Sequence, residues 1–275
     1  MLNDSILKCV PPNEDDILKN DNVNTLFIAT RHDTHAKYVM DGLRAGKNVY
    51  VEKPLCLNVE ELVEIRKLCE EKQRSVMIGF NRRFSPHAQE IKKKLGGGKM
   101  SMIYRCNAGS IPGDSWIQDL KVGGGRIIGE ACHFIDFMAY ICGSKPVKVM
   151  ASVMPDNQNL NDTMNIIVEF GNGSTGVVAY YANGSKSMPK EYFEVFSAGT
   201  SATLNDFTET RIFTKGVTKF KTHTQDKGQK AMIEAFFNEI RKGKTPIPMD
   251  EIFAVTLATF AALKSVQEGG VPVAF

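Results

Sequence analysis

A lysine in the segment Asn48 to Leu55, which reads Asn-Val-Tyr-Val-Glu-Lys-Pro-Leu, is placed where it could transfer a proton. The β-branched and aromatic run stops at Pro54, because proline cannot donate to a sheet ladder and favours an extended residue before it. Lys53 is therefore expected at the carboxyl end of a strand, which is the edge of an open parallel sheet where ligands bind. An ammonium there could contact a cofactor and transfer a proton. The alternative is an exposed turn lysine.

His133 is a second residue that could do chemistry. It stands alone on an apolar stretch from about Arg126 to Ile141, after three glycines at 123–125, and this stretch is predicted to be a helix. Such a histidine is either a core residue with bonded ring nitrogens or a group that faces a site. Oxidation of an alcohol needs a group that accepts the hydroxyl proton, and histidine or a lysine of lowered pKa can do this near neutral pH.

Alternating strands and helices are predicted around Lys53. Apolar runs at 23–29, 48–51 and 75–79 indicate strands, and the first is expected to be buried on both faces. The segments between them keep the apolar spacing of helices. This alternation is typical of an α/β, doubly wound (Rossmann-like) parallel sheet.

The pattern changes after residue 80. Strand-like runs separated by turns follow, and Gly171-Asn172-Gly173 is a strong hairpin signal. Hairpin-linked strands indicate an α+β domain with a mainly antiparallel sheet. The predicted strands of this part are 100–107, 147–153, 163–170, 175–181, 191–198, 201–204 and 209–213, and the predicted closing helices are 228–242 and 250–268.

Three segments are expected from these patterns. Residues 1–80 form a Rossmann-like dinucleotide-binding domain. Residues 81–249 form an α+β domain with a large open sheet and helices on one face. Residues 250–275 form a helix and tail that return towards the first domain.

Composition excludes several classes of protein. The 275 residues are 24% charged and 43% hydrophobic, as in an ordinary globular protein. The net charge of +3, without basic tracts interleaved with aromatics, argues against nucleic-acid binding. No secretory signal or membrane-spanning run is present in the sequence, so we expect a cytoplasmic protein without a membrane partner. Six scattered cysteines without a C-x-x-C pair indicate buried, reduced thiols and no metal site.

Four segments of the chain resemble the Gfo/Idh/MocA family of oxidoreductases. They are Leu26 to His35, Ala45-Gly-Lys-Asn-Val-Tyr-Val-Glu-Lys-Pro54, Gly79-Phe-Asn-Arg-Arg-Phe84, and glycines 123–125 followed by His133 and Asp136. The resemblance covers essentially the whole chain. It implies an oxidoreductase that uses NAD or NADP and acts on a sugar, sugar nucleotide or polyol by hydride transfer.

The resemblance also implies roles for particular residues. Lys53 is similar to the lysine that contacts the nicotinamide ribose and the substrate hydroxyl, with a cis bond to Pro54, and His133 is similar to the histidine that pairs with the substrate. These two are the catalytic candidates, and they are expected to meet across a cleft between the domains. The cofactor-binding candidates are Thr30, Arg31, His35, Glu52 and Lys53. The substrate-binding candidates are Arg83, Trp116, Glu130 and His133. From residue type alone, Arg83 could bind anionic or polyhydroxyl groups through its fork of donors or face solvent, and Trp116 could stack on a sugar face.

Two departures from the family pattern bear on activity. Members normally open with a strand, a G-x-G-x-x-G turn and a helix that holds the pyrophosphate. We expect this unit to be missing here, which leaves cofactor binding by the chain in question. Inositol dehydrogenase-like members also carry an aspartate four residues before the histidine, where this chain has Gly129. The nearest carboxylate, Glu130, is expected about 100° further round a regular helix.

These departures leave alternatives open. The chain could be a non-catalytic, shortened member that keeps the substrate domain, or the carboxyl-terminal part of a longer polypeptide whose full product is the enzyme. It could also carry out redox-assisted elimination on a sugar. The resemblance further implies that residues 1–80 are a truncated domain and that residues 81–249 bind substrate and pack their open sheet against another copy. We therefore expect a homo-oligomer, and the sheet edge exposed by the missing unit also favours association.

Overall fold

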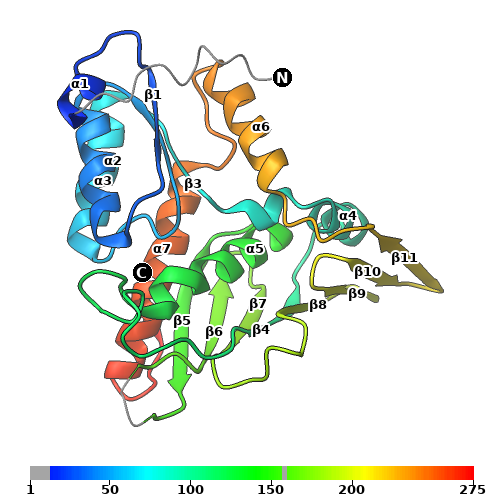
Figure 1. The fold of residues 1–275 in the computed structure, drawn as a ribbon. Coiled ribbons are helices and arrows are strands. Elements are labelled where there is room, and N and C mark those ends of the chain that lie inside the picture. Colours follow the sequence, from blue (N-terminus) through cyan, green and yellow to red (C-terminus); the bar gives the residue numbers. More distant parts are fainter. Residues whose placement is uncertain (1–12, 157–159) are drawn as a thin grey trace.

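Two β-sheets with helices packed between and around them make up the protein. The computed structural model describes residues 13–156 and 160–275. In these residues a small sheet has the strand order β1-β2-β3, and a larger sheet has the order β11-β10-β9-β8-β4-β7-β6-β5-β12. The small sheet lies above the large one in the view of Figure 1, with α5 and α7 between them. The predicted combination of a small parallel sheet and a large, mainly antiparallel sheet is confirmed.

The small sheet is parallel throughout, with Leu26 opposite Val49 and Val49 opposite Val76. Its strands therefore end at one common edge, and Lys53 follows the second of them. The elements of this part are α1 (Glu14–Leu18), β1 (Thr25–Ile28), α2 (His32–Arg44), β2 (Asn48–Val51), α3 (Val59–Lys72) and β3 (Val76–Ile78).

The strand β1 lies at the edge of the small sheet. It was predicted to be buried on both faces, and this is wrong, because the side chain of Phe27 remains 49% exposed. The Phe27 ring stacks on Tyr50 of β2 and meets the edge of Phe236 from a distant helix. An apolar run alone does not distinguish a central strand from an edge strand that a helix partly covers.

The large sheet changes direction at its middle strand β4, which is antiparallel to β8 and parallel to β7. The hairpin predicted at Gly171 to Gly173 is confirmed, since it joins the antiparallel strands β6 and β7. The strands are β4 (Ser101–Asn107), β5 (Pro146–Val153), β6 (Met164–Phe170), β7 (Thr175–Tyr181), β8 (Glu191–Ser197), β9 (Thr200–Asn205), β10 (Glu209–Phe213), β11 (Val217–Lys221) and β12 (Val273–Ala274).

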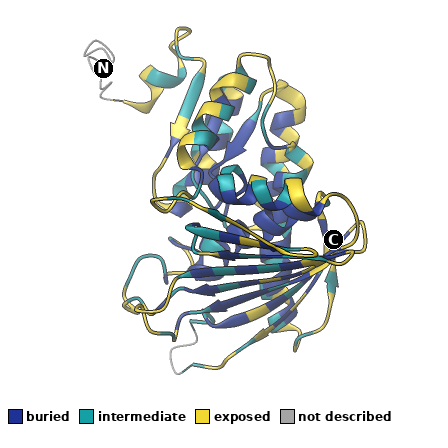
Figure 2. Cartoon of the chain, turned by 90° about the vertical axis from the view of Figure 1, so that its right-hand side faces the viewer, coloured by how far each residue is buried: buried dark blue, intermediate teal, exposed yellow. Residues whose placement is uncertain are grey.

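Helices cover one face of the large sheet, as predicted, and Figure 2 shows no helix of the described chain on the other face. The core on the covered face is aromatic: Tyr104 of β4 packs against Phe134 and Phe137, and Phe137 packs against Phe193. The helical elements are η2 (Asn81–Phe84), α4 (Pro86–Leu95), η3 (Ile127–Ala131), α5 (Cys132–Cys142), α6 (Gln229–Ile240) and α7 (Met249–Gln267).

The last helix, α7, contacts both parts of the chain. Its Ser265 hydroxyl accepts a hydrogen bond from the Ala151 amide of β5 at 2.9 Å. Its Phe253 ring lies under the Arg66 guanidinium of α3 at 5.8 Å. The helix therefore holds the first part of the chain against the large sheet.

Five cysteines are free and buried, as predicted for reduced thiols, while Cys9 lies outside the described residues. Helices with the length and apolarity to cross a bilayer do not occur in the described residues.

Candidate active site

Lys53 lies just beyond the carboxyl end of β2, on the edge where the strands of the small sheet end. The Lys53–Pro54 peptide bond is cis, as the family resemblance implied. The side chain is partly buried, and its ammonium forms no hydrogen bond or ion pair within the described residues. A cation is therefore held at the sheet edge without a protein partner.

His133 lies in the first turn of α5 and is 6% exposed. Its Nδ1 is enclosed and has no hydrogen-bond partner in the described part of the chain. Burial, followed by the charges of Arg82, Lys53 and other cations, lowers the pKa of His133 well below 6.5. The imidazole is therefore neutral at pH 7, and it is not the core histidine with bonded nitrogens that the sequence left as an alternative.

The two catalytic candidates come from different parts of the chain and share one electrostatic environment. The charge of Lys53 lowers the pKa of His133 and also that of Glu130. The charge of Lys53 therefore acts on both His133 and Glu130, which belong to the second part of the chain. The expectation that they meet across a cleft between the domains stays a prediction.

Glu130 lies in η3, a π-helical turn that precedes α5. A regular α-helix had been predicted here, and the wider π-turn replaces it, as often happens at functional sites. The carboxylate accepts a hydrogen bond from the Tyr180 hydroxyl at 2.9 Å and lies 3.5 Å from the Lys190 ammonium. Burial alone would raise the pKa of Glu130, but Lys190, Lys53, Tyr180 and Arg126 together lower it. Glu130 is therefore ionised and turned towards the region of Lys53.

A histidine of the first domain occupies the space beside Gly129. The ring of His32 lies so close that a Cβ at position 129 would be 3.2 Å from its Cε1. Burial lowers the pKa of His32 to about 4, so the ring is neutral and its Nδ1 donates to the Gly123 carbonyl at 2.8 Å. Gly129 thus permits close approach of the two domains where relatives were expected to carry an aspartate.

Trp116 is half-buried and contacts the first part of the chain, and Arg31 lies beside it as an exposed residue. The His32 ring meets the edge of the Trp116 ring at 4.9 Å, and the Arg31 guanidinium lies 5.9 Å from the same ring. The loop that carries Trp116 also accepts a backbone hydrogen bond from Asp33 through the Val122 carbonyl. Stacking of Trp116 on a sugar stays a prediction.

The remaining cofactor-binding candidates lie along the edge of the small sheet. His35 contacts the carbonyls of Pro54 at 2.7 Å and Thr30 at 3.1 Å, so it ties the loops after β1 and β2 together. Glu52 accepts a hydrogen bond from the Tyr50 hydroxyl at 2.8 Å. The Thr30 hydroxyl is exposed beside that of Thr34 at 2.7 Å. Thr30 and Lys53 are the members of this set with side chains available to a ligand.

Arg83 is bound by carboxylates inside the protein. Its guanidinium bonds to Asp136 of α5 and to Glu251 of α7, and the side chain is 5% exposed. It therefore links three elements, and it neither faces solvent nor presents a free fork of donors. Its predicted role in substrate binding has no support in this geometry.

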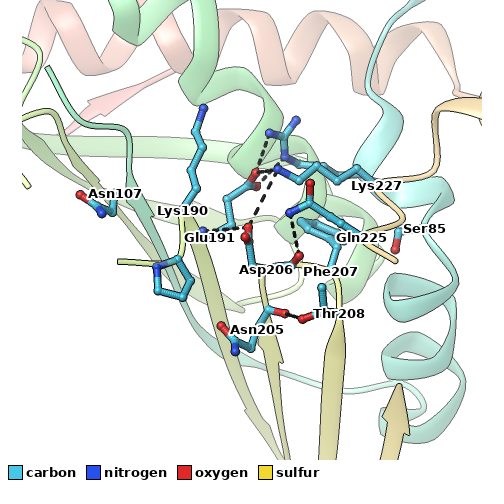
Figure 3. Close-up of polar contacts among 12 residues, drawn as sticks. Ser85, Asn107, Lys190, Glu191, Asn205, Asp206, Phe207, Thr208, Gln225 and Lys227 are labelled. Carbon is cyan, nitrogen blue, oxygen red and sulfur yellow. Dashed lines mark hydrogen bonds and ion pairs between the residues drawn. The ribbon is translucent and has the colours of Figure 1, made fainter. Parts of the chain in front are cut away.

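The neighbouring Arg82 belongs to a second buried network. Glu191 at the start of β8 is fully buried and accepts hydrogen bonds from Arg82, Lys227 and Tyr104. Figure 3 shows the Glu191 carboxylate directed at Lys227, while the Lys190 side chain extends away from Asn205. Burial opposes ionisation, but Arg82 and Lys227 outweigh it and lower the pKa of Glu191 to about 2.

A polar pocket of about 510 Å³ adjoins this network. It lies where β4 and β9 end and β8 begins, and Lys190 borders it. Its other polar lining residues include Asn107, Lys186, Ser187, Asn205, Asp206 and Thr208.

Sequence reasoning missed three residues of this region: Arg126, Tyr180 and Lys190. Tyr180 lies near the end of β7 and Lys190 precedes β8, and both reach Glu130 because these strands flank β4. Local spacing carries no sign of such a contact. Arg126 directly follows the three glycines, and that position was the one signal that could have drawn attention to it.

Comparison with known protein families gives matches over most of the chain. The family described as "Oxidoreductase family, NAD-binding Rossmann fold" (Gfo/Idh/MocA) matches residues 8–80. The model described as the Gfo/Idh/MocA C-terminal domain matches residues 79–203. Both parts of one family are therefore present, in the expected order.

Individual relatives agree with this family match. The chain is 26% identical over 262 residues to an inositol 2-dehydrogenase of Rhizobium meliloti, and the aligned region covers 90% of this chain and 79% of that protein. It is 27% identical over 173 residues to a myo-inositol 2-dehydrogenase of Thermotoga maritima, covering 59% of this chain and 51% of that protein.

Solved structures show the same fold. A levoglucosan dehydrogenase in complex with NADH and levoglucosan superposes with a TM-score of 0.82 at 20% identity. The superposition covers 96% of this chain and 83% of the dehydrogenase.

Proposed function

This chain belongs to the Gfo/Idh/MocA oxidoreductase family, and from that premise we propose that it is an NAD-dependent dehydrogenase of a sugar or polyol. The observation that carries the proposal is a neutral, partner-free imidazole at His133 within the field of an unpaired ammonium at Lys53. A base and a cation in one region are what removal of a hydroxyl proton requires.

His133 is the proton acceptor in this proposal. Its Nδ1 is enclosed by protein, so Nε2 is the nitrogen that can reach a ligand. The lowered pKa keeps this nitrogen unprotonated at pH 7, ready to take the proton of a secondary hydroxyl. Lys53 donates a hydrogen bond to the same oxygen and stabilises the negative charge that develops on it.

The edge of the small sheet suits a dinucleotide. The carboxyl ends of β1 and β2 bring Thr30 and Lys53 to one edge, where the Thr30 hydroxyl is exposed and the Lys53 ammonium has no partner within the described residues. Arg31 and Glu52 flank them, and His35 holds the two loops in register. When bound there, NAD supplies the acceptor for the hydride of the carbinol carbon.

Titration with cofactors and an assay with polyols test this function. The purified protein is expected to bind NADH, measured by the fluorescence of the nucleotide, and to form NADH from NAD with at least one member of a panel of inositols and hexoses. Parallel titration with NADPH shows which nucleotide is preferred. Absence of binding at millimolar nucleotide together with absence of turnover over the panel would refute the proposal.

The uncovered face of the large sheet supports association of copies of this chain. Ile103 of β4 and Phe196 of β8 lie on this face and are 43% and 46% exposed. Met150 of β5 adds a third exposed apolar side chain. Exposed apolar side chains of this size, spread over adjoining strands, are typical of a protein interface.

We expect the protein to be a homo-oligomer through this face. Ile103→Lys combined with Phe196→Lys should lower the molar mass measured by light scattering to that of a monomer, because each ammonium would be buried in the interface. Val217→Lys on the edge strand β11, where Val217 is also exposed, is the matched control and should leave the mass unchanged. A monomeric wild-type protein would contradict the expectation.

A further inference from the structure

Arg126 is a buried cation without a carboxylate partner in the described part of the chain. It is 4% exposed, its Nη1 donates to the Gly109 carbonyl at 2.6 Å, and its guanidinium lies over the Tyr180 ring at 5.4 Å. No other hydrogen bond or ion pair holds it within the described residues. Its Nε and Nη2 are not fully enclosed by protein, so a ligand can reach them. An almost buried guanidinium with free donors is costly unless something else binds them.

Glu130 is a partly buried carboxylate whose ionised form three cations favour. Lys190 lies 3.5 Å from it, and the charges of Lys53 and Arg126 also favour its ionised form. Within the described residues, Lys53 has no hydrogen-bond or ion-pair partner, and Glu130 is the one carboxylate paired with Lys190. Positive charge therefore exceeds negative charge at this end of the site.

The neighbouring cations do not offset this excess. Arg82 and Lys227 share Glu191, and Lys227 also lies 4.0 Å from Asp206. This network is balanced within itself. The unbalanced charge belongs to Lys53, Arg126 and Lys190, whose charges all favour the ionised form of Glu130.

The position of the excess charge indicates which ligand meets it. Arg126 and Lys190 belong to the second domain, at the start of η3 and of β8, whereas the cofactor is proposed to lie along the edge of the small sheet. A guanidinium with two free nitrogens can bind both oxygens of a carboxylate or phosphate, and a lysine adds a point charge beside it.

On the premise of the dehydrogenase proposed above, we infer that its substrate is a sugar or polyol that carries an anionic group, a carboxylate or a phosphate, bound by Arg126 and Lys190. The anionic group supplies the charge that this end of the site lacks, while His133 and Lys53 act on a hydroxyl of the same molecule. A neutral polyol would leave the donors of Arg126 without a charged partner.

Simple anions test the site without any turnover. Inorganic phosphate and acetate are expected to bind the full chain in isothermal titrations in chloride buffer. Arg126→Met and Lys190→Met should each weaken this binding by about 10- to 100-fold, the usual range for charged hydrogen bonds. Arg126→Lys should retain part of it, and Lys219→Met, which removes an exposed lysine of β11, should retain all of it.

Matched sugars then test the substrate class. D-glucuronate, D-galacturonate and myo-inositol 1-phosphate are compared with glucose, galactose and myo-inositol, both for binding in the presence of NADH and for turnover with NAD. At least one anionic member should bind about tenfold or more tightly than its neutral partner, and the preference should vanish in Lys190→Met. Comparing the affinities of the carboxylate and phosphate sugars shows which of the two anionic groups the substrate carries.

The outcomes separate this inference from the dehydrogenase proposal. Equal binding of anionic and neutral partners, no binding of any anion, or equal binding by wild type and both methionine variants would overturn the anion site. An effect of Arg126→Met on NADH affinity instead of sugar affinity would also overturn it. If anions bind, if the Arg126 and Lys190 variants weaken that binding, and if no sugar is turned over, the anion site stands and the dehydrogenase proposal is refuted.

Discussion

Replacing His133 with asparagine is expected to lower kcat by about 10²- to 10⁴-fold, the usual effect of removing a general base. Asparagine has a similar size and polarity, so the buried first turn of α5 should keep its fold. It cannot accept a proton at neutral pH, whereas the imidazole is held neutral and without a partner for its Nδ1. The measurement is the rate of NADH formation at saturating substrate.

The control for this substitution is His223→Asn. His223 is exposed and lies outside the region between the sheets, so its replacement should leave kcat unchanged. Equal melting temperatures of the two variants and the wild type would show that folding is intact. A kcat for His133→Asn within a few-fold of the wild type would remove His133 from the catalytic role.

Glu191→Gln is expected to lower the free energy of unfolding by about 3–5 kcal/mol, because it leaves buried cations without their counter-charge. Arg82 and Lys227 both bond to this fully buried carboxylate, and glutamine would supply no charge to either. The measurement is urea denaturation at pH 7, followed by circular dichroism. A loss below about 1 kcal/mol, as for an exposed ion pair, would contradict the expectation.

The pH dependence of the free energy of unfolding of the wild type is an independent test of the role of Glu191. The pKa of Glu191 is lowered from its ordinary 4.5 to about 2, so its ionised form is favoured in the folded state. This stabilisation is complete above pH 4.5 and is lost as the pH falls towards 2. The difference between wild type and Glu191→Gln should therefore shrink over that range. Asp250→Asn, which breaks an exposed pair with Lys145, is the matched control and should cost less than about 1 kcal/mol.

Much of the fold could be predicted from apolar spacing and turn residues. The strands at 48–51, 175–181 and 209–213 were predicted with the bounds that the structure shows. The strands β11 and β12 were missed, because β11 alternates with exposed lysines at a sheet edge and β12 has two residues. The predicted burial of β1 failed at Phe27, since sequence does not tell which strand ends a sheet.

The site was predictable only where a local motif marked it. The Glu-Lys-Pro segment placed Lys53 at a strand end, and the lone histidine on an apolar helix drew attention to His133. Arg83 has the same local surroundings as a ligand-binding arginine, and only the fold shows that Asp136 and Glu251 already bind it.

The charged surroundings of Glu130 were beyond sequence reasoning for a different reason. Lys190 and Tyr180 are 60 and 50 residues away from it in the chain. They meet it through the pairing of β7, β4 and β8, which local patterns do not encode. The π-turn at η3 also moves the Glu130 side chain from the place that a regular α-helix would give it.

A double-mutant cycle of Lys53→Met and His133→Asn tests the central claim most directly, namely that these two residues act on one hydroxyl. Each single variant should lower kcat strongly, and the double variant should be no more than about threefold slower than the slower single variant, because groups that act as a unit are not additive. Losses that multiply in the double variant, or a Lys53→Met variant as fast as the wild type, would contradict the claim.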